Sequence, residues 1–396
     1  MKRILFVINS LAIGGSEKSL VSLLNLIDYS KYEVDLLMLK KGEPFDKYIP
    51  QEVNILDIPD YYRFLTGDSK NINLYKKTLY MISRYKSSIE LRLNGKLNKK
   101  INNQQIFYRN QKRILDKLST KYDVAIAYAQ GFPTYFVAEK VESDKKLAWI
   151  NCDYTATLYD KDLDKKFYDR IDNIIAVSES GKKSIVNVNN DYEGKIKIIK
   201  DIVNPNLIKE MAEESIGELD EEEINILTVA RIVKGYKGYD LAVKAAGLLK
   251  DEGYKFKWYA IGDGPDKEQI EELIKENNVE DEFVLLGSRD NPYPYMKKCN
   301  IYVQPSRVEG FGLTVAEAKI LRKPIVCTNF RTAKELINNN IDGLIVNINE
   351  KSISDGIKMY MENRGLKGRI INNLNNNEPY TTMGELDKIY KLADMN

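Results

Sequence analysis

Hydrophobic and polar positions along this chain alternate between two patterns. Short runs of β-branched and other apolar residues are each followed by a stretch in which apolar positions recur every three to four residues. The first pattern is typical of buried strands and the second of amphipathic helices, so their alternation predicts parallel α/β units. The predicted strands of the first series are residues 3–8, 33–39, 123–128, 147–151, 173–177 and 196–199. Those of the second series are residues 224–229, 255–261, 283–286, 301–304, 324–327 and 343–346.

The two strand series predict two α/β domains, which a length of 396 residues also favours because one hydrophobic core rarely serves so long a chain. Between the series, residues 204–223 contain Pro205 and end in an acidic run, which indicates an inter-domain linker. We therefore expect domains at 1–205 and 206–380, and a C-terminal helix at 381–396 that could pack back on the first domain. Ligands of open α/β sheets bind beyond the carboxyl ends of the strands, so two facing sheets would define a cleft.

Residues 60–120 interrupt the first series and are strongly basic, with 14 Lys and Arg residues against 4 Asp and Glu residues in a chain whose net charge is only +2. Apolar residues recur there at three-to-four-residue steps, which is the pattern of a basic amphipathic helix. These residues are Leu74, Met81, Ile82, Tyr85, Ile89 and Leu93. Such a helix can lie on an anionic membrane surface. Alternatively, it is a solvated insertion whose apolar stripe packs on its own domain; nucleic acid is a poorer interpretation because no binding motif is recognisable.

Composition excludes several classes of protein and of chemistry. With 43% hydrophobic and 30% charged residues, and no apolar run near the roughly 20 residues that span a bilayer, the sequence predicts a soluble protein without a transmembrane helix. The cysteines, Cys152, Cys299 and Cys327, have no paired spacing, which indicates neither a disulfide framework nor a thiolate zinc site and fits a reducing cytoplasm. The absence of histidine excludes imidazole bases, histidine-dependent triads and the usual catalytic zinc ligands.

The most informative stretch is residues 303–318, VQPSRVEGFGLTVAEA, where a predicted strand ends and a helix begins. Glu309 and Glu317 lie eight positions apart around Gly310-Phe311-Gly312. Glycines let backbone approach a ligand, a helix start offers unpaired N–H groups, and carboxylates accept hydrogen bonds from hydroxyl groups. The stretch therefore predicts a site for a polyhydroxy compound such as a sugar. Glu317 has an alternative interpretation, a capping box with Thr314 in which it would only satisfy a backbone donor.

Three further turns follow predicted strands. Residues 14–18, Gly-Gly-Ser-Glu-Lys, make a glycine turn with Ser16 as the expected helix N-cap, and this turn is either a plain connection or an anion site. Arg231 follows the first strand of the second domain, and Lys237-Gly238 comes six residues later, at the next helix start. The two cations suit a diphosphate, unless they are only surface charges. Gly262-Asp263-Gly264-Pro265 would let a ligand approach backbone, or is a simple turn.

Taken in order, these features resemble the retaining glycosyltransferases of family 4, and the resemblance covers nearly the whole chain. Its most specific part is the pair Glu309 and Glu317 within residues 303–318, joined by Arg231 with Lys237-Gly238 and by the glycine turns. The resemblance implies the GT-B fold, which consists of two facing Rossmann-like domains, here with the basic helical insertion in the first. The nucleotide-sugar would bind chiefly to the second domain.

The resemblance also implies roles for individual residues. Glu309 would hold hydroxyls of the donor sugar, whereas Arg231 and Lys237 would neutralise the diphosphate as it leaves, so these three are the expected catalytic residues. The implied donor-binding residues are Gly15, Gly262, Gly264, Gly287, Gly310, Phe311, Gly312, Leu313, Thr314 and Glu317. No cofactor or metal is implied, because family members work without a bound catalytic metal. The Asp160-x-Asp162-x-Asp164 run accordingly reads as a solvated helix start rather than a metal site.

One position departs from the family pattern. Many relatives carry a histidine in a His-x-Asp arrangement after a strand of the first domain, where this chain has Asn151-Cys152-Asp153. Asn151 can hydrogen-bond a sugar hydroxyl but cannot become charged. Asp153 could contact the acceptor or the sugar. The missing histidine puts the donor preference, and activity itself, in question.

The expected reaction moves a sugar, with retention of anomeric configuration, from a nucleotide-diphosphate sugar to a glycan or lipid-linked glycan in cell-surface polysaccharide biosynthesis. A UDP-sugar is favoured as donor, although the residues alone identify neither base, sugar nor acceptor. The alternatives are a nucleotide-sugar epimerase of similar fold and a catalytically silent relative that binds sugar nucleotides. We expect a cytoplasmic protein, peripheral on the inner face of the cell membrane where residues 60–120 bind anionic lipid, and no nucleic-acid partner.

Overall fold

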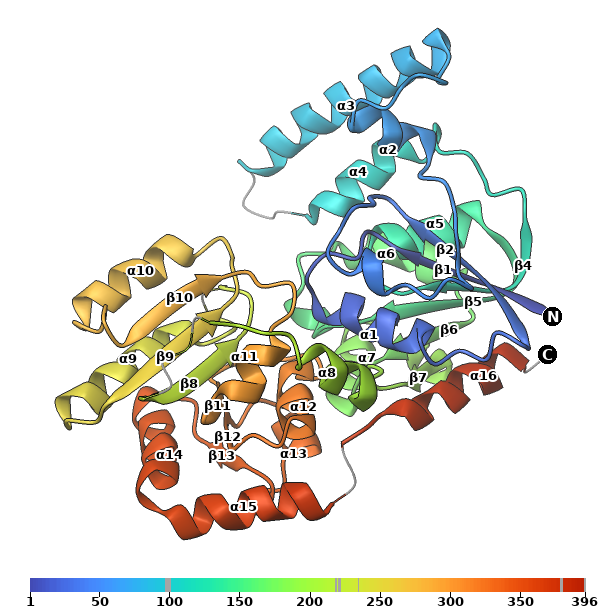
Figure 1. The fold of residues 1–396 in the computed structure, drawn as a ribbon. Helices are drawn as coiled ribbons and strands as arrows, with labels where there is room; N and C mark the ends of the chain where they lie inside the picture. The colour runs from blue at the N-terminus through green and yellow to red at the C-terminus, as the bar shows by residue number, and fades with distance from the viewer. Residues whose placement is uncertain (97–100, 218, 220–221, 234, 378–379, 395–396) are drawn as a thin grey trace. The chain divides into compact units, whose positions relative to one another are not determined.

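The computed structural model describes residues 1–96, 101–217, 219, 222–233, 235–377 and 380–394. It divides into two compact units, Met1–Asp201 with Gly384–Asn396, and Ile202–Met383. Each unit is a parallel sheet with helices around it (Figure 1). The predicted fold class, two parallel α/β domains with a helical insertion in the first, is confirmed.

The sheet of the first unit has the strand order β3-β2-β1-β4-β5-β6-β7, with every pair parallel. Its strands are β1 (Lys2–Ile8), β2 (Tyr32–Met38), β3 (Asn54–Ile55), β4 (Lys121–Ala127), β5 (Glu142–Ile150), β6 (Asn173–Ala176) and β7 (Ile196–Ile198). The order reverses between β1 and β4. The carboxyl ends of these two strands therefore form the switch point at which open α/β sheets bind ligands.

Helices of the first unit include an insertion between β3 and β4, made of α2, α3 and α4. The helices are α1 (Gly15–Leu24), α2 (Asp60–Leu65), α3 (Leu74–Asn94), α4 (Asn103–Gln111), α5 (Phe132–Lys140), α6 (Lys161–Tyr168), α7 (Glu179–Val188) and α16 (Leu386–Asp394). The last of these, α16, packs on the start of the sheet. There Tyr390 stacks on Tyr32 with ring centroids 4.9 Å apart, and Lys2 pairs with Asp394 at 2.9 Å.

The second unit has the strand order β10-β9-β8-β11-β12-β13, again all parallel, and its switch point lies between β8 and β11. Its strands are β8 (Ile224–Val229), β9 (Phe256–Ile261), β10 (Phe283–Gly287), β11 (Ile301–Gln304), β12 (Ile325–Thr328) and β13 (Leu344–Val346). Its helices are α8 (Pro205–Met211), α9 (Tyr239–Asp251), α10 (Lys267–Glu276), α11 (Tyr293–Lys298), α12 (Leu313–Ile320), α13 (Ala333–Leu336), α14 (Glu350–Glu362) and α15 (Arg364–Asn376). Trp258 anchors the core, where its indole N–H donates to Thr228 Oγ1 at 3.0 Å.

All the predicted strands are present, and the differences have a common cause. The prediction missed β3 because its two residues are exposed and show no apolar pattern. Strand β5 begins at Glu142 rather than at residue 147, because its first five residues are polar yet pair with β4. Backbone pairing, rather than side-chain burial, defines both of these segments.

The linker predicted at 204–223 is wrong in its first part, because Pro205–Met211 forms helix α8 of the second unit. Asn204 caps this helix by accepting from the N–H groups of Asn206 and Leu207. Pro205 takes the first helical position, where its missing N–H is not needed, so the proline starts a helix rather than marking a loop. Residues 218, 220 and 221 of the acidic run lie outside the described residues.

The acidic run at 160–164 starts helix α6, as interpreted, but is not wholly solvated. Asp160 is the N-cap and accepts from the N–H of Leu163 at 3.1 Å. Asp164 is buried and accepts from Tyr154 Oη at 2.5 Å, from Gln105 Nε2 at 2.7 Å and from Tyr135. Burial raises the pKa of this carboxyl, and its hydrogen bonds oppose that rise. Asp164 therefore ties α6 to α4 and α5 rather than facing solvent.

Candidate active site

Glu309 lies in the loop after β11 with only 10% of its side chain exposed. Its Oε2 atom pairs with Lys237 Nζ at 2.7 Å. Its Oε1 atom accepts from Ser306 Oγ at 2.6 Å and from Gln304 Nε2 at 3.1 Å. These three donors fix the orientation of the carboxylate. Because a carboxylate accepts about four hydrogen bonds, about one acceptor position remains for a ligand.

Gln304, the last residue of β11, connects this loop to helix α12. Its Oε1 atom accepts from Tyr302 Oη at 2.6 Å and from Thr314 Oγ1 at 3.0 Å, and its Nε2 atom also donates to Ser306 Oγ at 2.8 Å. The sequence reasoning did not single out Gln304 or Ser306. One signal could have found them. Gln304 is a polar residue at the end of a buried strand, and the polar Ser306 follows two residues later, close to the predicted Glu309.

Helix α12 begins without a side-chain cap. Its N-cap is Gly312, whose φ of 96° is left-handed and whose Cβ, if present, would lie 2.7 Å from Leu336 Cδ1. The alternative capping box is wrong, because Thr314 lies inside the helix and Glu317, which is 2% exposed, accepts from Tyr293 Oη at 3.0 Å. As a glycine, the N-cap itself makes no side-chain hydrogen bond to the first turn of α12. Such a helix start favours an anion.

Lys237 reaches the carboxylate because the loop between β8 and α9 lies against the loop after β11. Gly238 is the N-cap of α9 with a φ of 68°, and a Cβ there would lie 1.9 Å from the Pro305 carbonyl oxygen. The guanidinium of Arg307 also ties the loop after β11 to the first turn of α9 through both carboxylate oxygens of Asp240, at 2.8 and 2.7 Å. The close approach at Gly238 therefore depends on glycine and places Lys237 at the site.

Arg231, the second predicted cation, lies just after β8 and is exposed. Within the described part of the chain, no carboxylate forms an ion pair with its guanidinium. The structure thus brings Lys237 and Glu309 into contact and leaves Arg231 facing solvent in the same loop. Its predicted contact with a diphosphate stays a prediction.

The glycines after β9 have a structural explanation. A Cβ at Gly262 would lie 1.8 Å from the carbonyl oxygen of Ala230, and one at Gly264 would lie 2.0 Å from that of Ile232. The N–H of Ile232 donates to the Asp263 carbonyl at 3.0 Å. Glycine is needed here because the chain after β8 packs on this turn, and ligand contact is not required to account for either glycine.

The other predicted donor-site residues of the second unit surround the start of α12, except Gly287 at the end of β10. Gly287 has a φ of 71° with open space around its Cβ position. Phe311 is buried, whereas Gly310 and Leu313 are half-buried. The segment 310–314 thus combines an apolar anchor with partly accessible backbone.

At the switch point of the first unit, helix α1 begins at Gly15 with Gly14 as its N-cap, so the prediction of Ser16 as N-cap is wrong. Ser16 Oγ instead donates to Glu17 Oε2 at 2.9 Å. A Cβ at Gly14 would lie 2.2 Å from that same Oε2 atom, so glycine makes room for the folded-back carboxylate. Burial raises the pKa of Glu17. The carboxylate of Glu17, a half-buried residue, already lies at this helix start, so an anion bound at Gly15 would lie next to it.

Asn151 and Asp153 follow β5, so they also lie at the carboxyl ends of the strands of the first sheet. Asn151 Nδ2 donates to the Tyr128 carbonyl at 2.9 Å, and its N–H donates to Gln130 Oε1 at 3.3 Å. Its Oδ1 atom is buried without a hydrogen-bond partner among the described residues. Asp153 caps the short turn Tyr154–Ala156 by accepting from Thr155 N–H at 3.0 Å. Asn151 is therefore fixed by backbone, and Asp153 has a local structural role.

Asp201, after β7, is a buried acid that the sequence reasoning missed. It lies beside Ser19 and near Glu17. Burial raises its pKa to about 7, a rise opposed by the hydrogen bond from Ser19 and reinforced by the charge of Glu17. Ser19 also hydrogen-bonds Tyr128 Oη at 2.8 Å. A single acid after a strand carries no sequence pattern, so only the fold reveals this cluster.

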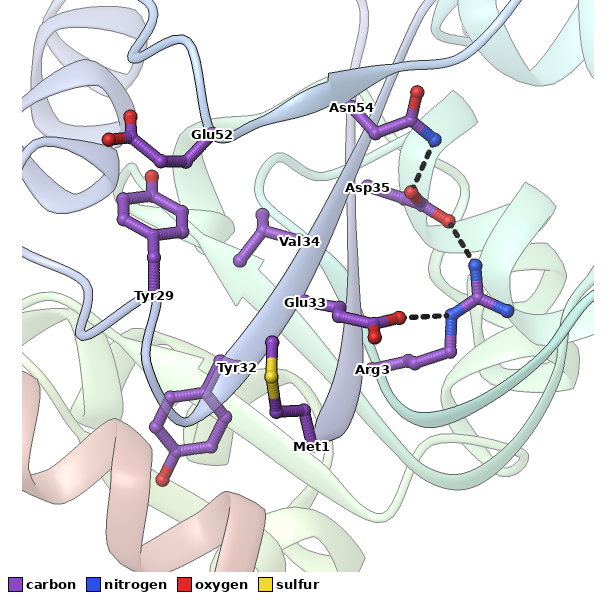
Figure 2. Close-up of a pocket in the computed structure, with 9 residues that line it drawn as sticks. All are labelled: Met1, Arg3, Tyr29, Tyr32, Glu33, Val34, Asp35, Glu52 and Asn54. Carbon is purple, nitrogen blue, oxygen red and sulfur yellow. Dashed lines mark hydrogen bonds and ion pairs between the residues drawn. The ribbon is translucent and has the colours of Figure 1, made fainter.

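A hollow of about 350 Å³ in the first unit lies at the opposite edge of the sheet, at the amino ends of β1 and β2 (Figure 2). Its polar groups satisfy one another: Arg3 pairs with Glu33 at 3.2 Å, and Asp35 accepts from Asn54 at 2.7 Å and Tyr122 Oη at 2.7 Å. Ligands of α/β sheets bind at the carboxyl ends of strands. This hollow is therefore not the candidate site.

Among the residues that the structure describes, no group of three or more His, Cys, Asp or Glu side chains gathers as a possible metal site. None of the described helices is both long enough and apolar enough to cross a bilayer.

Comparison with known proteins identifies the second unit most directly. Residues 210–376, which include the whole site around Glu309, match the family model described as Glycosyl transferases group 1. The chain is 26% identical over 371 residues to the N-acetylgalactosamine-N,N'-diacetylbacillosaminyl-diphospho-undecaprenol 4-alpha-N-acetylgalactosaminyltransferase of Campylobacter jejuni, covering 93% of this chain and 92% of that protein. It is 28% identical over 213 residues to the capsular polysaccharide biosynthesis glycosyltransferase CapM of Staphylococcus aureus, covering 50% and 55% of the two chains.

Solved structures share the fold. A mutant of S. aureus TarM, in complex with fondaparinux, alpha-GlcNAc-glycerol and UDP, aligns over 100% of both chains with a TM-score of 0.69 and 15% identity. Anabaena HepE in complex with UDP-glucose aligns over 99% of both chains with a TM-score of 0.69 and 14% identity. The chain is therefore a glycosyltransferase of the GT-B fold, and its residues 210–376 match the glycosyl transferases group 1 family model.

Proposed function

We propose that this glycosyltransferase moves a sugar from a nucleotide-diphosphate sugar to a glycan on a lipid carrier, with retention of anomeric configuration, in cell-surface polysaccharide biosynthesis. The observation that carries the proposal is the Glu309 carboxylate, held by Lys237 and two neutral donors at the β8/β11 switch point with about one acceptor position left. The matched family and the Campylobacter relative, whose name describes a diphospho-undecaprenol acceptor, support the reaction class and the acceptor.

In the proposed site, a hydroxyl of the donor sugar donates to the free acceptor position of Glu309. In this proposal Lys237, which pairs with the same carboxylate, bridges the sugar end and the diphosphate of one donor molecule. Arg231, exposed and without an ion pair among the described residues, would bind the diphosphate with its forked N–H groups. As the nucleotide leaves, negative charge grows on the diphosphate, and the two cations with the uncapped start of α12 stabilise it.

In this proposal the nucleoside end of the donor binds at Glu317, which would contact the ribose, and at Gly287, which would line the base pocket. Glu317 is 2% exposed and already accepts from Tyr293 Oη, so ribose binding would require its carboxylate to become accessible. We propose UDP as the nucleotide, a choice supported by the UDP and UDP-glucose named with the TarM and HepE structures. No metal is part of the proposal, because the two cations and the helix start supply the positive charge that the diphosphate needs.

We also propose that the enzyme works at the cytoplasmic face of the cell membrane. The lipid-linked acceptors named for the two Campylobacter relatives support a substrate held in a bilayer. All three cysteines are free thiols, as a reducing compartment allows. Asn151, which stands where many relatives carry histidine, keeps a buried acceptor atom without a partner among the described residues and is proposed to orient the sugar or the acceptor.

A thermal-shift panel of uridine, guanosine and adenosine diphosphates tests the proposed donor site. We expect UDP to raise the unfolding free energy by about 2.7 kcal/mol at 100 times its dissociation constant, and UMP to stabilise much less. Arg231→Ala and Lys237→Ala should each weaken UDP binding about tenfold or more, since a charge-assisted hydrogen bond contributes about 1.5–3 kcal/mol. Lys275→Ala, an exposed lysine of α10, is the matched control. Normal UDP affinity in both site variants would remove the diphosphate assignment.

A further inference from the structure

An ordinary surface helix buries its apolar face and exposes its polar face. Helix α3 of the basic insertion does the reverse, because its apolar face is exposed and its mainly polar face is buried. Its buried residues are Tyr80, Ser83, Ser87 and Asn94. Figure 1 shows α3 as the outermost helix of the insertion, beside α2 and α4. The predicted alternative, in which the apolar stripe packs on its own domain, is wrong.

Polar contacts hold the inward face of α3. Ser83 Oγ donates to the Asn110 carbonyl at 3.1 Å, and Asn94 exchanges two hydrogen bonds with the backbone of Ile101 at 2.9 and 3.0 Å. Glu90, the only acidic residue of this helix, accepts from Arg109 at 2.9 Å and from Asn110 at 2.9 Å, both on α4. These partners fix the rotation of α3 about its axis and turn its single negative charge inward.

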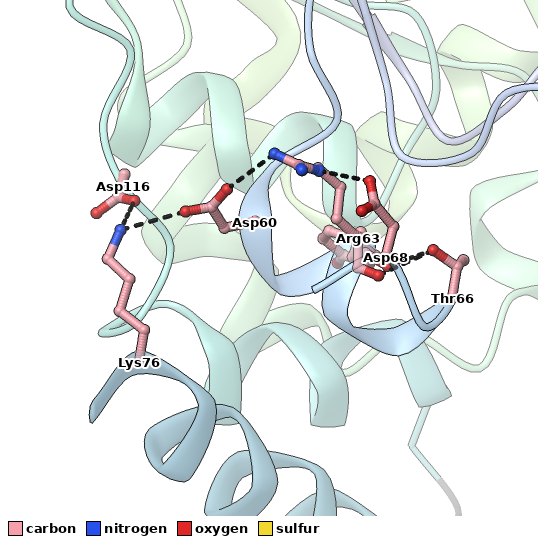
Figure 3. A network of polar contacts seen from close by, with 7 residues as sticks. Asp60, Arg63, Thr66, Asp68, Lys76 and Asp116 are labelled. Carbon is pink, nitrogen blue, oxygen red and sulfur yellow. Dashed lines mark hydrogen bonds and ion pairs between the residues drawn. The ribbon is translucent and has the colours of Figure 1, made fainter. Parts of the chain in front are cut away.

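The start of α3 is held by an ion-pair network (Figure 3). Lys76 Nζ lies 2.9 Å from Asp116 and 3.4 Å from Asp60, and Arg63 links Asp60 to Asp68 at 3.5 and 3.0 Å. The charge of Lys76 is thereby paired with carboxylates of residues 60–120. The remaining cations of α3 are Lys77, Arg84, Lys86 and Arg92.

The outward face of α3 is a mainly apolar stripe, interrupted by the exposed residues Thr78 and Arg92. Leu74 is 80% exposed, Tyr85 71%, Ile82 60% and Met81 58%. Together with Tyr75, Ile89 and Leu93, they form what we call the α3 stripe. At about 100° per residue these positions fall within roughly one third of the helix circumference, along a helix about 30 Å long. Monomeric soluble proteins rarely expose so large an apolar patch without a partner.

Cations border the α3 stripe on both sides. At about 100° per residue, Lys77 and Arg84 fall along one border and Lys86 along the other, whereas Arg92 falls within the stripe near the end of the helix. Arg84 and Lys86 are exposed, and neither forms an ion pair with another described residue. An apolar face between cationic borders, with the only acid turned away, complements a surface that is apolar inside and anionic at its rim.

We propose that the α3 stripe docks this enzyme on an anionic lipid bilayer, with the helix lying in the interface and its borders contacting lipid phosphates. Leu, Ile and Met side chains would enter the acyl boundary, while Tyr85 keeps its hydroxyl at the headgroups. The charges distinguish this occupant from a second copy of the chain, because two such stripes facing each other would bring like-charged borders together. The inference rests on the proposed function only in that a lipid-linked acceptor lies in the same bilayer.

Co-sedimentation of the full chain with vesicles, without donor or acceptor, tests the docking surface. We expect binding to vesicles of phosphatidylglycerol and phosphatidylcholine that exceeds binding to phosphatidylcholine alone by about tenfold or more. Raising salt from about 0.1 M to about 1 M should release the protein, since the Debye length falls from about 10 Å to about 3 Å. Equal binding to neutral vesicles, or no binding to either, overturns the proposal.

Two double variants separate the apolar and the ionic parts of the surface. Ile82→Gln with Tyr85→Gln, and Arg84→Gln with Lys86→Gln, should each lower vesicle partitioning about tenfold. The matched controls are Ile341→Gln with Met359→Gln and Lys255→Gln with Lys275→Gln, which change exposed residues of the second unit and should bind like the unchanged protein. If α3 variants and controls behave alike, the proposal is wrong.

Two readouts distinguish lipid docking from misfolding and from self-association of the chain. Each variant should keep the UDP-induced thermal shift, which shows that it is folded and that loss of vesicle binding is separate from any failure of the donor site. Sedimentation velocity without vesicles should give a monomer. A dimer that the Ile82→Gln with Tyr85→Gln variant dissociates would assign the stripe to a second copy and overturn the lipid assignment.

Discussion

Replacing Glu309 with Gln is expected to lower sugar transfer by about a hundredfold or more while leaving the fold intact. The neutral amide keeps the size of the side chain but loses the charge that holds Lys237 at 2.7 Å and weakens acceptance from a sugar hydroxyl. Because both groups would act on the departing donor, the loss should fall on kcat more than on nucleotide affinity. Transfer kinetics and UDP binding measured on one preparation separate the two effects.

The control for this substitution is Glu276→Gln, an exposed glutamate at the end of α10. We expect it to transfer sugar at the normal rate. The Glu309→Gln protein should unfold within about 1 kcal/mol of the unchanged chain, since its ion pair is partly solvated. Unchanged turnover in Glu309→Gln would contradict the site, whereas a large loss of stability would make its activity uninformative and shift the test to Lys237→Ala.

Asp201 is expected to make the protein less stable as pH rises from about 4 to about 7. Burial raises its folded-state pKa to about 7, whereas an unfolded aspartate ionises near pH 3.9. Between these values the folded state binds more protons than the unfolded state, so the free energy of unfolding falls with rising pH and levels off above about 7. The whole decline is of the order of 4 kcal/mol at about 1.36 kcal/mol per pKa unit.

Asp201→Asn should remove this decline, because the amide does not titrate in the same window. Urea midpoints for the two proteins, measured at several pH values, give the difference directly. Asp162→Asn, at an exposed aspartate of α6, is the matched control and should leave the pH dependence unchanged. Parallel curves for the unchanged chain and Asp201→Asn would show that Asp201 is ionised in the folded protein.

Sequence patterns predicted the parts of this fold that depend on burial. The strands of both sheets appear as apolar runs, and the basic insertion appears as charge and periodicity. They failed where backbone geometry decides the structure, as at β3 and at Pro205. They also left open a capping box of Thr314 and Glu317, which the helix start at Gly312 rules out. Local chemistry allowed the capping box, but the left-handed glycine moved the helix start.

The site was predictable as a set of residue types but not as a set of contacts. Glu309 and Lys237 are 72 residues apart, and their ion pair exists because β8 and β11 are neighbours in the sheet. Gly262 was expected to meet a ligand, yet the backbone at Ala230 occupies its open side. The direction of the α3 stripe was equally hidden, since periodicity defines an apolar face without showing whether it points inward or outward.

The anomeric configuration of the product decides whether this protein is a retaining transferase. The reaction contains the protein, a UDP-sugar and a diphospholipid-linked glycan acceptor, and NMR gives the configuration of the product. We predict a product with the configuration of the donor, formed only with acceptor present, and almost none with Glu309→Gln. An inverted product would contradict the retaining mechanism. Conversion of the UDP-sugar without any acceptor would indicate the epimerase instead, and UDP binding without turnover would indicate a catalytically silent relative.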